Sequence, residues 1–326
     1  MKVSILVPVY GVEKYIEKCI VSLFEQTFDD IEYIFVNDCT KDCSIAVLQS
    51  VMKRYPNRVL SVRIVNHECN KGLAASRNTA VGIATGEYLM HVDSDDYIER
   101  DTVEKCVAEI ERTAADAVVF GFRNIFEGKE YIEHAIIPND MKEYVCKIIR
   151  RECSVCICGG LYRRSLYVDN HVYAIEGVNM GEDYATKPRL MYYAKKVVAI
   201  DEPLYNYVHY NYASYTKNFT HSTIDNLVRV VFVLTSFFEQ KMDYAFYKDS
   251  LSVACLLNKI VLLKYWVQSD ASITYLDKIN ALYPLENNFQ LINKSHKLIL
   301  YLSLKRWTNL LRIYVKFGIK INQLLS

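Results

Sequence analysis

Short apolar runs alternate with helical patterns along the first 120 residues of the chain. Val3–Val9 is almost continuously apolar, as in a strand covered on both faces. From Val12 to Gln26, apolar residues recur at helical spacing. Further strands are predicted at residues 31–36, 60–65, 88–92 and 117–122, and further helices at 45–55, 73–84 and 101–113. This order predicts βαβ units stacked into an α/β fold, with a mostly parallel sheet flanked by helices.

The pattern changes twice further along the chain. Residues 123–180 mix short strands with a helix near 141–149 and a break at Gly159-Gly160. From about Ser222 only helical patterns remain, after a polar stretch at 216–222. We therefore predict one domain at 1–218, in which residues 123–180 are an elaboration, and a helical C-terminal region at 219–326.

Composition and missing motifs argue against several classes of protein. With 39 basic and 38 acidic side chains, the chain has no overall field that would attract nucleic acid, and no nucleic-acid partner is expected. The glycine motifs of dinucleotide oxidoreductases and P-loop kinases are not in the sequence. The apolar start is too short for a signal peptide, and no uncharged apolar run approaches about 18 residues. We expect a cytoplasmic protein without a spanning helix.

Ten cysteines are scattered along the chain. Cys19 and Cys106 lie on predicted helix faces, where thiols pack as small hydrophobes. Cys153, Cys156 and Cys158 resemble half of a zinc site, but no second pair of Cys or His follows at finger-like spacing. We interpret these three as structural thiols.

Polar residues follow each of the first four predicted strands. Because open α/β sheets bind ligands beyond the carboxyl ends of their strands, we expect these residues to converge on one rim. In chain order they are Pro8-Val9-Tyr10-Gly11, Asn37-Asp38-Cys39-Thr40, Asn70-Lys71-Gly72 and Asp93-Ser94-Asp95-Asp96.

The acidic run Asp93–Asp96 is the sharpest of these features. Carboxylates this close repel each other, so the cluster is favoured where a cation lies between them. A divalent ion held by one or two carboxylates and by substrate phosphates explains the run. The alternative is an acid-rich helix start, because a helix is predicted a few residues later. After a buried strand, we favour the metal.

Six segments share their order and spacing with a known family. They are Ser4–Tyr10, Ser22–Thr27, Asn37-Asp38, Asn70–Asn78, Gly86–Asp96 and Gly181–Tyr184. Together they resemble the family-2 glycosyltransferases with the GT-A fold, over about residues 1–215. The resemblance implies a Rossmann-like GT-A sheet, with a nucleotide-sugar half at about 1–100 and an acceptor half at about 101–218. It also implies a UDP-sugar donor and Mn²⁺ or Mg²⁺.

On the nucleoside side, the resemblance implies that Pro8–Tyr10 form the pocket floor and that Asp38 reads the pyrimidine base. The family usually has two acids here, followed by Gly-Ser. This chain instead has Asn37 and Cys39-Thr40, which leaves Asp38 as the lone carboxylate. The identity of the donor nucleotide is therefore left open.

The resemblance also assigns the diphosphate and the metal. Asp95 matches the metal ligand, and Asp93 matches a contact to the ribose or the ion. Ser94 falls between them and is counted with the donor site. Lys71 and Arg77 fall where the donor diphosphate is approached.

The catalytic base is implied at Asp183, with Glu182 as its neighbour on the acceptor side. A Glu-Asp pair after Gly181 is also a common helix start, and the residues alone favour that alternative. Pro188 predicts that the helix begins near Pro188 rather than at Asp183. The implied reaction is a single displacement that inverts the anomeric carbon.

One further departure concerns the diphosphate. After Tyr205-Asn206-Tyr207 the family often has an arginine loop, whereas this chain has Val208 and His209. Two interpretations stay open: His209 replaces the arginine, or it is a packed or surface histidine.

The last 40 residues contain basic but no acidic side chains from Asn287 onward. Lysines and arginines alternate there with Leu, Ile, Tyr, Trp307 and Phe317. Such a helix can lie on an anionic membrane surface, here the inner face of the plasma membrane. An ordinary packed helix with a basic solvent face is the alternative.

We therefore expect an inverting, metal-dependent hexosyltransferase-type enzyme in surface-polysaccharide biosynthesis. Its acceptor would be a saccharide or a lipid-linked saccharide. Two rival hypotheses are a sugar nucleotidyltransferase and a catalytically silent, nucleotide-binding scaffold subunit. The first usually needs a glycine-rich basic loop after strand one, and Pro8–Gly11 is not one.

Overall fold

The computed structural model describes residues 1–211, 221–268, 273–282 and 287–325. The chain divides into two compact units, Met1–Asn218 and Phe219–Ser326. We call the first the sheet unit and the second the helical unit.

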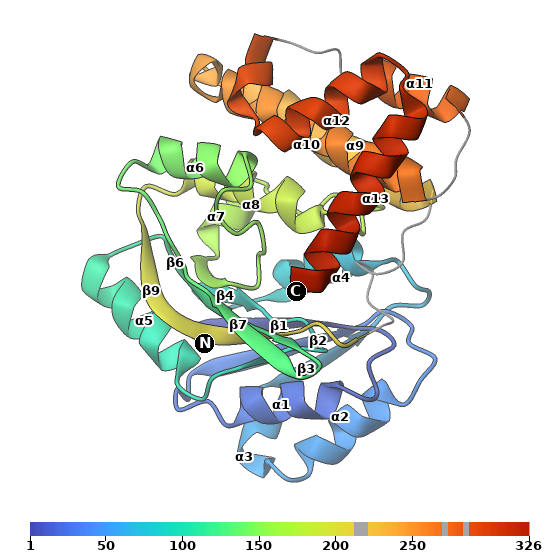
Figure 1. Ribbon diagram of the computed structural model, residues 1–326. Helices are drawn as coiled ribbons and strands as arrows, with labels where there is room; N and C mark the ends of the chain where they lie inside the picture. Colours follow the sequence, from blue (N-terminus) through green and yellow to red (C-terminus); the bar gives the residue numbers. More distant parts are fainter. Residues whose placement is uncertain (212–220, 269–272, 283–286, 326) are drawn as a thin grey trace. The chain divides into compact units, whose positions relative to one another are not determined.

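The sheet unit alternates strands and helices along the chain (Figure 1). Its described strands are β1 (Val3–Val9), β2 (Ile31–Asn37), β3 (Val62–Asn66), β4 (Tyr88–His91), β5 (Tyr97–Ile98), β6 (Ala117–Phe126), β7 (Lys129–Glu133), β8 (Gly160–Arg163) and β9 (Val197–Val208). Its described helices are α1 (Ile16–Phe24), α2 (Ser44–Met52), α3 (Pro56–Val59), α4 (Leu73–Ile83), α5 (Thr102–Thr113), α6 (Met141–Ile149), α7 (Ser165–Val168) and α8 (Glu182–Tyr193).

All these strands join one sheet in the order β3-β2-β1-β4-β8-β6-β9-β5, with β7 paired to β6. The pairs β3-β2, β2-β1, β1-β4 and β6-β9 are parallel, and the other pairs are antiparallel. In Figure 1, α1, α2 and α3 lie on one face of the sheet, and α4, α7 and α8 lie on the other. The predicted α/β architecture is confirmed: three of the parallel pairs join β1, β2, β3 and β4 in the βαβ region, and the fourth joins β6 and β9.

β1 and β2 form the centre of the core because their side chains are covered on both faces. All seven residues of β1 and the first six of β2 are buried, which matches their continuous apolar sequence. The same pattern that predicted these strands therefore also predicts where the core lies.

The expected break at Gly159-Gly160 is wrong. Gly160 begins β8, which pairs with both β4 and β6. The glycines are needed for close packing: a Cβ on Gly159 would lie 2.4 Å from the Phe122 ring, and one on Gly160 would lie 2.8 Å from the Val118 carbonyl. A glycine inside a strand therefore marks a close approach here rather than a turn.

The helical unit contains α9 (His221–Glu239), α10 (Tyr244–Gln268), α11 (Ile273–Leu282), α12 (Lys294–Leu304), α13 (Thr308–Leu325) and a short 3₁₀ segment, η2 (Asn287–Leu291). The expected helical C-terminal region is thus present. α10 contacts α9, α11, α12 and α13 and is the core helix of this unit.

Within the described residues, α10 alone is long and apolar enough to cross a membrane by length and composition. Its apolar stretch contains Lys259 and Lys264. A search of the sequence for uncharged apolar runs therefore does not find this helix. Of its most apolar 18-residue window, 72% is buried. Burial of this kind is expected for a core helix.

Candidate active site

The carboxyl ends of β1, β2 and β4 meet at one edge of the sheet. β1 pairs in parallel with β2, up to Val9 opposite Asn37, and with β4 on its other side. The strand order reverses beside β1, and open α/β sheets bind ligands at such a point. Tyr10 is 46% exposed here, whereas Pro8 and Val9 are buried. Of the expected pocket floor, only Tyr10 offers an exposed side chain, and β2 adds the half-buried Asn37.

Asp38 is directed into the protein rather than toward this edge. Its Oδ1 accepts hydrogen bonds from the Lys71 amide at 2.8 Å, and it lies 2.7 Å from His67 Nδ1. Its Oδ2 accepts from the Gly72 amide at 2.8 Å. Only 3% of Asp38 is exposed. Protein donors occupy this carboxylate, and Asp38 positions the loop that carries Lys71. The base-reading role that the resemblance implies for Asp38 stays a prediction.

The acidic run separates into buried and partly exposed members. Asp96 accepts hydrogen bonds from the Val208 amide at 2.7 Å and from the Tyr205 hydroxyl at 2.8 Å. Burial, and then the charges of Asp95 and Asp93, raise the pKa of Asp96 well above its ordinary value. Asp96 therefore holds the run against β9, and Asp96 and Ser94 are both too buried to present their side chains to a ligand.

Asp93 and Asp95 are the members that stay partly exposed. Asp95 Oδ2 accepts a hydrogen bond from Asn211 Nδ2 at 2.8 Å. Burial and the charge of Asp93 raise the pKa of Asp95. Two adjacent carboxylates with too few donors fit a hard divalent ion, which needs one or two carboxylates when substrate phosphates complete its shell. Among the described residues, no group of three His, Cys, Asp or Glu is placed to hold a metal. A metal at Asp93 and Asp95 would thus need ligands from the substrate.

Arg77 lies at the centre of three carboxylates. Its guanidinium nitrogens lie 3.0 Å from Asp93, 3.5 Å from Glu182 and 3.6 Å from Asp183. Burial would lower the pKa of Arg77, but these acids raise it well above its ordinary value. The side chain is 4% exposed and links the acidic run to the start of α8. Its expected contact with a diphosphate stays a prediction, and Lys71 is the exposed cation of the predicted pair.

Glu182 and Asp183 carry the second half of the site. Burial, and then the charge of Asp183, raise the pKa of Glu182 to about 8. Burial also raises the pKa of Asp183, against the opposing effect of Arg77. Asp183 Oδ2 accepts a hydrogen bond from the Ile157 amide at 3.1 Å. Near neutral pH, Glu182 therefore holds a proton, which reduces the negative charge beside Asp183.

The helix α8 begins at Glu182, so the expected start near Pro188 is wrong. Gly181 precedes it with φ +84°, a left-handed conformation that glycine adopts without strain. Pro188 lies inside the helix, where it removes one amide donor. Side chains supply other donors to this segment: the Thr186 hydroxyl donates to the Glu182 carbonyl, and Arg189 Nε donates to the Ala185 carbonyl.

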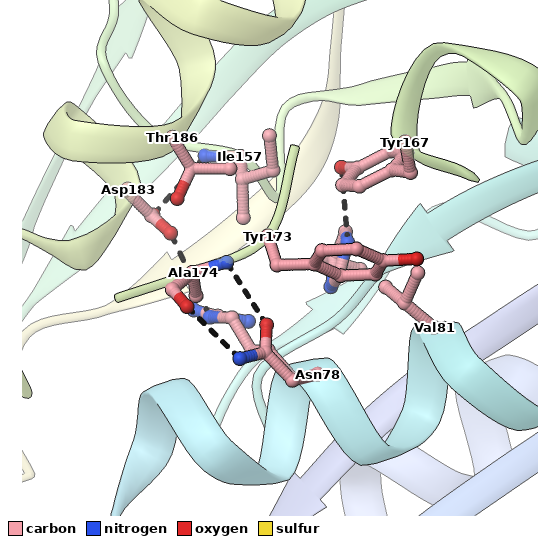
Figure 2. Close-up of a pocket in the computed structure, with 10 residues that line it drawn as sticks. Asn78, Val81, Ile157, Tyr167, Tyr173, Ala174, Asp183 and Thr186 are labelled. Carbon is pink, nitrogen blue, oxygen red and sulfur yellow. Dashed lines mark hydrogen bonds and ion pairs between the residues drawn. The ribbon is translucent and has the colours of Figure 1, made fainter. Parts of the chain in front are cut away.

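Figure 2 shows a small cavity behind Asp183, bounded by Asn78, Tyr167 and Tyr173. Its volume is about 10 Å³, room for about one water molecule. Asn78 closes one side through two hydrogen bonds of 2.9 Å with the main chain of Ala174. The side of Asp183 that faces this cavity is thus closed to a ligand. Its side chain is still 17% exposed, so a ligand must approach from the opposite side.

A much larger cavity, of about 500 Å³, lies between β6, β7, the end of β9 and residues 151–156. We call it the large cavity. His209 lies on its wall: its Nε2 is 2.8 Å from Asn124 Oδ1, and its ring stacks on Phe126 at 4.1 Å. Of the two interpretations of His209, the structure therefore supports the packed one.

The sequence singled out His209, Cys153 and Cys156 but not two buried polar residues of this cavity. Lys187 and Asn124 line it and are 1% and 3% exposed. The one signal in the sequence is that Lys187 stands four residues after Asp183, on the same face of a helix. Because the helix was expected to begin at Pro188, that signal was lost.

The cysteine cluster borders both parts of the site. Cys156 lines the large cavity, and Cys158 is buried 3.9 Å from Arg77 Nη1. Cys153 Sγ donates to the Ile136 carbonyl at 3.4 Å. All ten cysteines fall in the described residues and are thiols.

Similarity to known proteins agrees with this architecture. The model of glycosyl transferase family 2 matches residues 4–169, just over half of the chain. The uncharacterized glycosyltransferase EpsJ of Bacillus subtilis is 32% identical over 212 residues, 63% of this chain and 60% of EpsJ. The chain thus matches less than two thirds of EpsJ.

Two solved structures share the fold. The structure of residues 1–349 of Staphylococcus aureus TarS, in complex with UDP-GlcNAc, has a TM-score of 0.74 and 20% identity, and the match covers 98% of this chain and 92% of that one. The mannosyltransferase PcManGT of Pyrobaculum calidifontis, in complex with GDP-Man and Mn²⁺, has a TM-score of 0.51 and 18% identity over 96% of this chain and 84% of that one. At these identities, the likeness shows the fold alone.

Proposed function

Because the chain belongs to glycosyl transferase family 2, we propose that it transfers a sugar from a UDP-type nucleotide donor to a hydroxyl of a saccharide or lipid-linked saccharide. The observation that carries the proposal is the link through Arg77 between Asp93, at the end of β4, and Asp183, at the start of α8. This link holds Asp93, in the expected site of the metal and diphosphate, close to Asp183, a carboxylate that can accept a proton. Relatives that bind UDP-GlcNAc or GDP-Man with Mn²⁺ support a nucleotide-sugar donor.

In the proposed reaction, Asp183 takes the proton of the acceptor hydroxyl. The acceptor oxygen attacks the anomeric carbon as the bond from that carbon to the diphosphate oxygen breaks on the opposite face, so the configuration inverts. The nucleoside diphosphate leaves with the electron pair of that bond. A bound Mn²⁺ or Mg²⁺ would supply neutralising charge for this leaving group.

The protein's own residues prepare this step. Asp93 and Asp95 would hold the ion, and the exposed Lys71 would approach the diphosphate. Glu182, protonated near neutral pH, limits the negative charge around Asp183 and so allows Asp183 to be ionised. Arg77 keeps the three carboxylates in place.

We place this activity in surface-polysaccharide biosynthesis. Support comes from a relative, the Staphylococcus aureus poly(ribitol-phosphate) beta-N-acetylglucosaminyltransferase TarS, which is 28% identical over 214 residues, 64% of this chain and 35% of TarS. The two rival hypotheses, a sugar nucleotidyltransferase and a silent scaffold subunit, make different predictions in the same experiment.

The test is a thermal-shift screen of UDP-, GDP-, dTDP- and CDP-sugars with and without Mn²⁺, followed by transfer assays. A binding donor raises the unfolding temperature by mass action. We expect UDP-sugars to do so, and Mn²⁺ to increase the effect. Asp95→Ala and Asp183→Ala should then abolish transfer. Wild-type rates in both variants would refute the site, whereas donor binding with no transfer to any saccharide tried would favour the scaffold.

We also propose that the helical unit rests on an anionic membrane surface from the cytoplasmic side. α13 packs Leu311 and Val315 into the unit, yet leaves Ile313 and Phe317 each 65% exposed. Trp307, just before it, is 50% exposed. An exposed apolar row in a basic, acid-free segment suits the boundary between lipid headgroups and acyl chains.

The membrane proposal is tested with Trp307→Ser/Phe317→Ser. Binding to vesicles rich in phosphatidylglycerol should fall at least about tenfold, because apolar side chains supply most of the interfacial free energy. Phe232→Ser is the matched control, because Phe232 is 69% exposed on α9, outside this segment. Equal vesicle binding by wild type and the double variant would contradict the proposal.

A further inference from the structure

The large cavity adjoins the proposed catalytic carboxylate. Cys156 lines the cavity, and the next residue, Ile157, donates its amide to Asp183. Lys187, also in the cavity wall, stands one helical turn after Asp183, a rise of about 6 Å. A molecule that fills the cavity would therefore lie beside Asp183, on the acceptor half of the sheet unit.

Lys187 is a buried cation that lacks a counter-ion in the described part of the chain. Its Nζ donates one hydrogen bond, of 2.8 Å, to the Cys156 carbonyl. No carboxylate of the described residues lies within 4.0 Å of this nitrogen, although the ammonium group has three N–H donors. Burial lowers the pKa of Lys187, which is the expected effect of desolvating a charge. An unpaired buried charge is costly, so an anion at this point would stabilise it.

Asn124 supplies a second unused donor in the same cavity. Its Oδ1 is engaged by His209, but its Nδ2 has no hydrogen-bond partner in the described structure. The residue is 3% exposed. Buried amide donors are almost always hydrogen-bonded, and leaving one unpaired costs about 1–3 kcal/mol. Like Lys187, Asn124 therefore has an N–H donor that the described residues leave open to an oxygen acceptor.

The rest of the wall is suited to a sugar ring. Phe122, Tyr144 and Tyr207 line the cavity. Flat aromatic faces with a few fixed polar groups are the usual composition of a small-molecule site. The acids in the wall, Glu133 and Glu152, belong to its exposed part, and Glu152 is paired with Arg150 at 2.7 Å. Positive charge thus lies in the depth of the cavity at Lys187, whereas its exposed part carries both signs, since Arg151 lies there beside the two acids.

We propose that the large cavity binds an acceptor saccharide that carries an oxyanion, either a carboxylate or a phosphate. Lys187 Nζ and Asn124 Nδ2 donate hydrogen bonds to this oxyanion. The inference rests on the proposed sugar transfer, because that reaction brings an acceptor beside Asp183. A neutral saccharide would leave the ammonium without a counter-charge. The acceptor class is therefore an acidic saccharide, either a uronate or a sugar phosphate.

The test compares three probes by ligand-observed NMR titration of the full chain without donor. They are methyl glucoside, which is neutral, methyl glucuronide, which carries a carboxylate, and glucose 6-phosphate. At least one acidic probe should bind about tenfold or more tightly than methyl glucoside. Preference for methyl glucuronide indicates a uronate acceptor, and preference for glucose 6-phosphate indicates a sugar phosphate.

Lys187→Met keeps the length of the side chain and removes its charge, so it should reduce the acidic probe to the affinity of methyl glucoside. Asn124→Asp keeps the acceptor for His209 and adds a negative charge, with the same expected loss. It also keeps the proposal testable if Lys187→Met does not fold. Lys129→Met, an exposed lysine on β7, is the control and should bind as wild type does.

Stabilisation by UDP and Mn²⁺, measured on the same samples, separates the two proposals. If UDP and Mn²⁺ stabilise the protein but neither acidic probe binds more tightly than methyl glucoside, the acidic-acceptor inference is wrong and the donor site stands. The inference is also wrong if Lys187→Met and Asn124→Asp both fold and still bind the acidic probe more tightly than methyl glucoside. If no nucleotide binds but Lys187-dependent discrimination persists, the cavity is an oxyanion site and the transfer proposal fails.

Discussion

The segments that follow β2 and β4 look alike in sequence. Each comes after a buried strand, carries acidic side chains and lies at the same edge of the sheet. At the β2 end, Asp38 accepts hydrogen bonds from two amides and contacts His67. At the β4 end, Asp95 has one side-chain donor among the described residues, Asn211, and burial together with the charge of Asp93 raises the pKa of Asp95. The number of protein hydrogen-bond donors around a carboxylate therefore decides whether it holds the fold together or is left for a ligand.

The sharpest test of this contrast is Asp95→Ala at the β4 end. Transfer should fall about 10³-fold or more, because the leaving diphosphate loses its metal-borne neutralisation. Stability should stay the same or rise, since the change relieves repulsion with Asp93. Transfer rates and thermal unfolding of the same preparation check both parts. A large loss of stability would show that Asp95 also holds the fold together.

The reciprocal change at the β2 end is Asp38→Asn. It places an amide group where the Lys71 and Gly72 amides need an acceptor, so the free energy of unfolding should fall by about 3 kcal/mol. Urea denaturation measures this loss. The exposed Glu127→Gln serves as a control and should change stability little. If Asp38→Asn were as stable as wild type but had lost UDP binding, the scaffold role would be contradicted and the base-reading role supported.

A third test uses the buried acid Glu182. Its pKa is about 8 in the folded protein and 4.5 ordinarily, so between these pH values the folded chain holds a proton that the unfolded chain has lost. The free energy of unfolding therefore falls as pH rises through this window, by up to about 1.4 kcal/mol per pH unit.

Glu182→Gln should remove that slope, which urea titrations between pH 5 and about 8 would detect. Burial, the larger cause of the raised pKa of Glu182, remains in Asp183→Asn, but this variant removes the charge of Asp183 and should therefore lower that pKa part of the way toward its ordinary value. Carboxyl NMR shifts report this directly. An unchanged pH slope in Glu182→Gln would assign the bound proton to another group.

The smallest expected effect is that of Lys71→Met. Asp38 holds the main chain of this residue, so the side chain can change without loss of stability. We expect the Kd for UDP to rise about tenfold, as for one lost hydrogen bond to a charged group. Titration of UDP into both proteins measures it. A fall in stability with unchanged UDP affinity would mean that the side chain, too, belongs to the scaffold.

The spacing of apolar residues predicted most of the fold, because a strand or helix that is buried on one face or on both leaves a local pattern of apolar residues. Strand β1 and helix α6 have the expected bounds. Asp93 and Tyr10 were expected at one edge of the sheet because each follows the carboxyl end of a predicted strand. Pro188 misled the prediction of α8, since the helix begins six residues earlier, at Glu182, and carries the proline inside it.

The contacts that define the site were not predictable in this way. Asp38 meets the Gly72 amide 34 residues later, and Arg77 meets Asp183 from another helix. Which partner a charged side chain finds depends on the packed structure, and no local pattern encodes it. The large cavity arises in the same way, from segments that are separate in sequence.

The fixation of the main chain at Lys71 and Gly72 also bears on how fast a donor can be captured. A loop that must order itself around a ligand gives up conformational entropy at that moment, and its association is slowed by the search for the right shape. Here the amides are already held by a buried carboxylate. The cost of ordering this loop is met during folding, and capture of the donor there can proceed at the rate of encounter.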